Sequence, residues 1–105
     1  MKYELEELAQ QLWHASQHHR LCRIHLIGEP LTRVIHPYGI CQTSRGKIML
    51  IAWQSMGFTK AGAKEGYRNL ALDEIDELEV METHFSVRSD FNPQDGQYTD
   101  WVFHI

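Results

Sequence analysis

The sequence contains no apolar run long enough to cross a membrane as a helix. A membrane-spanning helix needs about 20 consecutive, mostly apolar residues, whereas the longest apolar run here, Ile48 to Trp53, has the length of a strand. The first residues, Met1 to Glu7, are acidic and lack the apolar core of a secretory signal peptide. We therefore expect a cytoplasmic protein that is not exported and has no membrane partner.

Cysteine is scarce, and this limits the use of disulfides and metals. The two cysteines, Cys22 and Cys41, both lie in apolar stretches that are typical of strands. A disulfide would need an oxidising compartment, which nothing else in the sequence indicates, and a zinc site would need more Cys or His ligands at short spacing. We expect two small buried thiols and no cofactor.

Motifs that carry catalysis are absent as well. The chain has no Gly-x-Ser-x-Gly elbow, no P-loop and no dinucleotide-binding fingerprint. The carboxylates from Asp73 to Glu79 form a run that is typical of a solvated face, whereas a general acid and base need two carboxyl groups that differ in burial. We expect that the protein is not an enzyme.

Histidine, by contrast, is abundant, with seven residues. His14 and His18 are four residues apart, so a helix would place them on one face, where they could share a metal ion. No cysteine or carboxylate stands at a suitable local spacing to complete such a site. The favoured hypothesis is that these imidazoles lie near the negative end of the helix dipole, and a histidine-based metal enzyme ranks lowest.

The remaining composition is that of one ordinary globular domain. A chain of 105 residues fits a single domain, and a hydrophobic fraction of 43% is usual for one. Leu5, Leu8, Leu12 and Ala15 recur at three- and four-residue intervals, which predicts an amphipathic helix over residues 3–20. We expect this N-terminal helix to pack on the part of the domain that follows.

Five strands are predicted behind the helix, from alternating apolar residues and the turns between them. Pro37 cannot donate to a ladder, so the second strand should bend there or lie at an edge. The third strand is apolar on both faces and needs a second layer, for which we expect the helix. A helix over residues 73–83 is the alternative to the fifth strand. The expected strands span residues 21–27, 33–43, 48–53, 67–72 and 75–81.

Charge is unevenly distributed along the chain, whose formal net charge is −4. Residues 21–70 carry seven basic and two acidic side chains, so the middle of the chain could present a basic face to an anion. An ordinary solvated surface is the alternative. Residues 55–66 contain three glycines and are expected to form a mobile loop. The acidic tail, residues 84–105, is rich in aromatic residues and should pack against something.

From Thr32 to Glu79 the order of features resembles the WYL domain family. In that family an arginine precedes a Pro-Tyr pair, a hairpin leads into an apolar strand, and an aromatic-Arg stretch comes before an acidic turn and an isoleucine. Only the leucine of the name-giving Trp-Tyr-Leu tripeptide is kept, in Ile48-Met49-Leu50. The corresponding segments are Arg33-Val34-Ile35-His36-Pro37-Tyr38, Gly46-Lys47, Ile48-Met49-Leu50-Ile51-Ala52-Trp53, Gly66-Tyr67-Arg68-Asn69-Leu70 and Asp73-Glu74-Ile75.

The resemblance implies a small five-stranded, Sm- or SH3-like barrel over residues 21–83, with residues 84–105 as an extension of the same domain. Members of the family are typically ligand-sensing parts of bacterial transcription regulators, and they bind nucleotides or single-stranded nucleic acid through basic and aromatic residues. Residues 1–20 supply one helix and no helix-turn-helix module. We therefore expect a stand-alone module that acts with a regulator protein or as a homo-oligomer.

Candidate ligand contacts are the basic, aromatic and imidazole side chains of the matching segments. A guanidinium pairs with phosphate through two parallel hydrogen bonds, and the alternative for the arginines is a salt bridge to the acidic tail. Aromatic rings stack on bases, for about 1–3 kcal/mol per base, with simple packing as the alternative. Cations at the hairpin tip would add electrostatic attraction. The predicted site comprises Arg33, His36, Tyr38, Arg45, Lys47, Trp53, Tyr67 and Arg68.

Two functional hypotheses follow from these patterns. The first is a regulatory binding module for an anionic ligand, either a nucleotide or single-stranded nucleic acid. The second is a protein-interaction module with no small ligand, which docks through its acidic, aromatic tail from Phe91 to Ile105.

Overall fold

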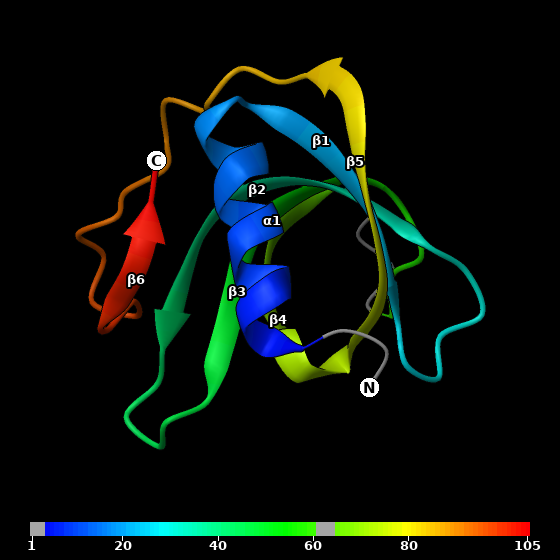
Figure 1. The fold of residues 1–105 in the computed structure, drawn as a ribbon. Helices are drawn as coiled ribbons and strands as arrows, with labels where there is room; N and C mark the ends of the chain where they lie inside the picture. Colours follow the sequence, from blue (N-terminus) through cyan, green and yellow to red (C-terminus); the bar gives the residue numbers. More distant parts are fainter. Residues whose placement is uncertain (1–3, 61–64) are drawn as a thin grey trace.

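The described residues, 4–60 and 65–105, form one α-helix followed by a curved, six-stranded antiparallel sheet in the computed structural model (Figure 1). The prediction of a mainly β protein behind an N-terminal helix is confirmed. The elements are α1 (Leu5–Gln17), β1 (Arg20–Leu26), β2 (Arg33–Gln42), β3 (Ile48–Gly57), β4 (Gly66–Ala71), the 3₁₀ turn η1 (Leu72–Glu74), β5 (Ile75–His84) and β6 (Trp101–His104).

The helix α1 forms because its apolar residues share one face. Leu8, Leu12 and Ala15 are fully buried, as their three- and four-residue spacing requires. Glu6 and Glu7 lie in the first turn, where the helix dipole favours negative charge. No helix in the described part of the chain is long and apolar enough to cross a bilayer.

The helix is shorter than predicted at its C-terminal end. It ends at Gln17, and His19 adopts a left-handed conformation with a φ of 52°, so that β1 begins at Arg20. A residue other than glycine seldom takes this conformation, and no glycine in the sequence indicated a turn here. The predicted start at residue 3 lies outside the described residues.

The main core lies between α1 and the concave face of the sheet (Figure 1). Because successive strand residues point to opposite faces, alternate residues of each strand reach this core. They pack against the apolar stripe of the helix. The buried cluster consists of Leu8, Leu12, Ala15, Cys22, Ile24, Leu26, Ile35, Ile40, Leu50, Ala52, Leu70, Leu72 and Ile75.

The sheet is open and has six strands, so the structure does not form the closed five-stranded barrel that was expected. Its strands run in the order β4-β3-β2-β1-β5, and β6 adds to β2. Between β4 and β5 the chain passes through η1, and among the described residues no ladder joins these two strands. Residues 75–84 form a strand paired with β1, and the alternative of a helix over residues 73–83 is therefore wrong.

Strand β2 bends at Pro37, as predicted, and the bend changes its partner. The ladder with β3 shifts register between Pro37 and Gly39. Before the bend β2 pairs with β1, and after it β2 pairs with β6. A Cβ at Gly39 would lie 2.5 Å from the carbonyl oxygen of Phe103, so the absence of a side chain allows β6 to approach this closely.

Strand β3 has two buried faces, and the C-terminal tail covers the one that α1 does not. Leu50 and Ala52 face the main core, whereas Ile51, which is 1% exposed, and Trp53 point the other way. On this second face the tail, residues 85–105, places Arg88 over the Trp53 ring, while its β6 strand pairs with the neighbouring β2. The expectation that the helix would provide the second layer is wrong, because α1 lies on the core side.

Candidate ligand-binding site

Part of the predicted site is brought together on the outer face of β2, β3 and β4. The ladders pair His36 with Trp53 and Trp53 with Tyr67, so these side chains form a row across three strands. Tyr38 lies two residues beyond His36 on the same strand, and its ring centroid is 6.0 Å from that of Tyr67. We call these four residues the aromatic face.

The aromatic face is covered by the segment that follows β5, Phe85 to Phe91, which we call the cover. The Phe85 ring stacks on His36 at a centroid distance of 4.8 Å. The Phe91 ring lies edge-on against Tyr38 at 4.7 Å. Together these contacts close the face, and Tyr38 is fully buried as a result.

The middle of the cover makes polar contacts with the same face. The guanidinium carbon of Arg88 lies 3.7 Å from the centroid of the Trp53 ring, in a cation–π contact. The Arg88 backbone N–H donates to Tyr38 Oη over 3.0 Å. Tyr67 Oη donates to Asp90 Oδ1 over 2.6 Å, and the Arg88 guanidinium donates to both Asp90 oxygens over 3.1 Å.

These contacts shift the pKa values of the groups involved. The hydrogen bonds from Arg88 and then from Tyr67 lower the pKa of Asp90. Burial and the neighbouring Asp90 carboxylate raise the pKa of Tyr67. Near neutral pH the site therefore holds an ionised carboxylate between a phenol and a guanidinium. The Asp90 side chain is 55% exposed, so this carboxylate lies at the solvent edge of the cluster.

His36 is the one predicted contact that lacks a hydrogen bond where it needs one. Its Nδ1 atom is buried, and no described residue bonds to it. Burial first and then the charge of Arg88 lower the pKa of His36, so the ring is neutral near neutral pH. A buried ring nitrogen without a partner is unusual in a native structure, and here it lies directly under Phe85.

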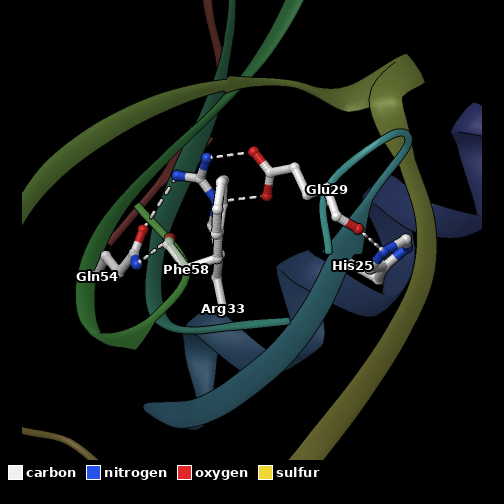
Figure 2. Close-up of polar contacts among 5 residues, drawn as sticks. All are labelled: His25, Glu29, Arg33, Gln54 and Phe58. Carbon is white, nitrogen blue, oxygen red and sulfur yellow. Dashed lines mark hydrogen bonds and ion pairs between the residues drawn. The ribbon is translucent and has the colours of Figure 1, made fainter. Parts of the chain in front are cut away.

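Arg33, predicted as a primary anion contact, is instead held inside the protein (Figure 2). Its Nε and Nη2 donate to the two carboxylate oxygens of Glu29, over 2.9 and 2.5 Å, and its Nη1 donates to Gln54 Oε1 over 3.1 Å. The residue is 5% exposed. Arg33 therefore forms a structural salt bridge, which was the alternative interpretation, but its partner is Glu29 and not the acidic tail.

The Arg33 network fastens the connection between β1 and β2. Gln54 on β3 donates to the carbonyl of Phe58, and the carbonyl of Glu29 bonds to His25 Nε2 (Figure 2). His25 Nδ1 in turn lies 2.6 Å from Asp76 Oδ1 on β5. The hydrogen bond to Asp76 is the main cause that raises the pKa of His25.

The other predicted cations do not join the aromatic face. Arg45 and Lys47 are exposed at the hairpin between β2 and β3, and roughly 20 Å of strand separates His36 from the end of β2. Arg68 donates to the carbonyl of Tyr67, but it pairs with Ala52 and so lies on the face opposite Tyr67.

Sequence reasoning did not identify the polar residues of the cover. Nothing in the local sequence marks Arg88 and Asp90, because no periodic pattern precedes them and the cover contains no regular secondary structure. One signal was present, since Arg88 is the single basic residue in the acidic stretch 71–105. An isolated cation among carboxylates is a candidate for a specific contact.

Thiols and metals contribute nothing further to this site. Cys22 and Cys41 are free and buried, as predicted, and burial raises the pKa of Cys22 to about 12. Within residues 4–60 and 65–105, no group of three or more His, Cys, Asp or Glu side chains is arranged to hold a metal ion.

Comparison with known proteins adds no family to this description. The chain matches no protein-family model, no curated protein and no solved structure.

Proposed function

We propose that this protein is a regulatory binding module whose aromatic face takes up an anionic ligand with a planar ring, either a nucleotide or a short single-stranded nucleic acid. In the structure the cover occupies this face. Binding therefore requires the cover to move aside, and the cover sets the balance between a closed and an open state.

The observation that carries the proposal is the position of the Asp90 carboxylate. Tyr67 Oη and the Arg88 guanidinium hold it by charge-assisted hydrogen bonds, and these are donors that a phosphate group would also use. The carboxylate thus stands where the anionic group of a ligand would lie. A phosphate that replaced it would accept from Tyr67 Oη, which stays in place on β4 when the cover, with Arg88, moves aside.

The rest of the face suits a planar ring. Trp53 is already covered by a flat group, the Arg88 guanidinium, and a base would gain a comparable stacking contact there, worth about 1–3 kcal/mol. A ligand that displaced Phe85 would also reach His36 Nδ1, with which none of the described residues forms a hydrogen bond in the closed state. Binding would therefore give this buried nitrogen the hydrogen bond that it lacks in the closed state.

The sequence resemblance points to the same function. Tyr38 and Tyr67 belong to the segments that resemble the WYL domain family. The sheet is not closed into a barrel, and what supports this part of the proposal is its curved path of five strands, β4-β3-β2-β1-β5. A divergent, stand-alone WYL-like module that reports a ligand to a regulator is the form of the proposal that combines both arguments.

The proposal is tested by fluorescence anisotropy of labelled single-stranded DNA and RNA, at low and physiological salt, with unlabelled nucleotides as competitors. Asp90→Ala removes the internal anion, so its affinity should rise by about tenfold because more molecules are open. Asp95→Ala is the matched control, since it removes the same charge from an exposed turn outside the face. Tyr67→Phe should weaken binding, and binding should fall with added salt.

Two outcomes would contradict the proposal. If neither the wild-type protein nor Asp90→Ala binds any of these ligands saturably, while circular dichroism shows an intact fold, the aromatic face is only a packed second layer. Equal gains from Asp90→Ala and Asp95→Ala would mean that net charge alone, and not the site, controls binding.

One observation favours the second candidate function, a protein-interaction module without a small ligand. A groove of about 270 Å³ lies between α1 and β6, and beside it Trp13 is 50% and Val102 59% exposed. The rings of Phe91, Tyr98 and Trp101 pack against one another. Docking would therefore use this groove and not those rings. Failure to bind nucleotides, together with an association in sedimentation velocity that Val102→Ser abolishes, would support this function.

A further inference from the structure

The aromatic face contains two flat platforms side by side, and each is covered by a different flat group of the cover. The first platform is the imidazole of His36, on which the Phe85 ring lies with an interplanar angle of 21°. The second is the indole of Trp53, where the guanidinium carbon of Arg88 lies 3.7 Å from the ring centroid. The face therefore holds two stacked pairs in the closed state.

The β2–β3 ladder fixes the distance between the two platforms. His36 and Trp53 are direct partners in this ladder, so their side chains share one face of the sheet and their Cβ atoms lie about 4.5–5.5 Å apart. The groups that cover them, Phe85 and Arg88, follow one another on a segment without regular secondary structure. The cover thus places one flat group after another along the face, as a single-stranded nucleic acid would place its bases.

The two tyrosines of the aromatic face are not further platforms. The Tyr67 ring stands at 86° to the ring of Trp53, and its hydroxyl donates to the Asp90 carboxylate. Tyr38 is fully buried, and Phe91 meets its ring edge-on at 64°. Tyr67 is therefore suited to an anionic group and not to a third base.

The His36 platform lacks a hydrogen bond that its present cover cannot supply. The buried Nδ1 atom has no partner among the described residues, and the Phe85 side chain that lies on the ring has no polar atom. A nucleotide in the place of Phe85 would bring sugar hydroxyl groups and base nitrogens, which donate and accept hydrogen bonds. Because buried polar groups are normally paired, this nitrogen favours a role for His36 as a ligand contact over a role in packing alone.

We propose that the ligand of the aromatic face is a single strand with two successive unpaired bases, one stacked on His36 and one on Trp53. This inference rests on the proposed function and deepens it, because a mononucleotide would then fill only half of the site. Aromatic rings on a sheet stack successive bases of single-stranded RNA in the same manner. Each stacked base adds to the affinity, so a dinucleotide binds more tightly than a mononucleotide by the gain at the second platform.

The test compares dinucleotides that differ by one base and by no charge. The probe is the 5′-phosphorylated dinucleotide of deoxyadenosine, and its two controls lack the first or the second base but keep both phosphates. Each competes with a labelled single strand in fluorescence anisotropy, on the wild-type protein and on Asp90→Ala. Removing either base should weaken binding by at least about fivefold, the effect of losing one stacked base.

Variants of His36 show whether one of the two bases lies on this platform. His36→Ala should abolish the effect of removing one base and keep the effect of removing the other. His36→Phe retains a flat ring and should retain both effects. His104→Ala is the control, because it removes a histidine from β6, outside the aromatic face, and should also retain both. Each effect is a ratio of affinities, so a change in the fraction of open molecules, which scales all three ligands alike, cancels.

Two results would overturn this inference and leave the proposed function in place. One is a dinucleotide that binds no more tightly than one of its controls, since a single base would then account for all of the stacking. The other is a His36→Ala variant in which both effects persist, since the second base would then lie elsewhere. If no nucleotide or single strand binds saturably to the wild-type protein or to Asp90→Ala, the proposed function itself fails, and this inference fails with it.

Discussion

Burial decides which of two roles the Arg33 guanidinium has. On a surface it would be a candidate phosphate ligand, but here its donors meet the Glu29 carboxylate and the Gln54 amide. The Glu29 side chain is only 4% exposed. A carboxylate in such a place needs its partner, because an unpaired buried charge is strongly unfavourable.

Arg33→Met is therefore expected to lower the free energy of unfolding by about 3–5 kcal/mol, the usual effect of leaving one buried charge uncompensated. The double variant Arg33→Met, Glu29→Leu should recover most of this loss because no charge remains. Arg23→Met is the control, since its ion pair with Glu79 is exposed and should contribute at most about 1 kcal/mol. Urea denaturation measures all three, and equal losses in Arg33→Met and Arg23→Met would contradict the argument.

At the scale of elements, β6 depends on the bend in β2. The register shift at Pro37 turns β2 away from β1, and β6 occupies the free edge that this leaves. The carbonyl of Phe103 and the ring of Trp101 pass directly over Gly39. The cover and the tail are therefore held at both ends, by β5 and by β6.

Gly39→Ala should detach β6. The added Cβ would lie 2.5 Å from the Phe103 carbonyl oxygen and 2.7 Å from the Trp101 ring, so the strands must separate, with a loss of about 1–3 kcal/mol. Faster amide exchange in residues 101–104 and a red-shifted Trp101 emission would show this. Gly96→Ala is the control because a Cβ there meets nothing within 4 Å. Unchanged exchange in β6 of Gly39→Ala would refute the expectation.

The sequence was sufficient for the elements whose signal is local. The α1 stripe and the strand that includes Ile24 and Leu26 follow from periodicity, and the bend at Pro37 follows from its missing N–H. It was not sufficient for β6, because the sequence of Trp101–His104 does not alternate between apolar and polar residues, and this segment forms a strand by pairing with residues 60 to 65 positions earlier. The candidate site likewise has a part that the local sequence indicates and a part that it does not. His36, Trp53 and Tyr67 meet through strand register, whereas Arg88 reaches Trp53 only through a nonlocal fold of the tail.

The whole molecule consists of two layers on opposite faces of β3. The helix fills the concave side, and the tail covers the other side through Arg88 on Trp53 and Phe91 beside Tyr67. The Arg33 network lies at one end of this sandwich and joins β1, β3 and β5 through Gln54, Glu29 and His25. Two histidines of opposite pKa shift, His25 and His36, are thus part of the stability of the molecule.

These shifts predict opposite contributions to stability as the pH changes. The folded-state pKa of His25 is raised above 6.5, chiefly by the bond to Asp76. The contribution of His25 to the free energy of unfolding is therefore fully present below pH 6.5 and is lost as the pH rises through the folded-state pKa. The folded-state pKa of His36 is lowered by burial, so His36 instead destabilises the fold as the pH falls below 6.5 towards its folded pKa.

The variant Asp76→Asn removes the partner of His25 and leaves His36 unchanged. The difference in unfolding free energy between wild type and this variant therefore isolates the His25 contribution. This difference should be largest from about pH 5 to 6 and should shrink as the pH rises above the ordinary imidazole pKa. Urea denaturation across this range measures it, and Glu79→Gln controls for the loss of a carboxylate from the same strand. A difference that stays constant with pH, or grows towards alkaline pH, would mean that the Asp76 bond does not favour the protonated form of His25.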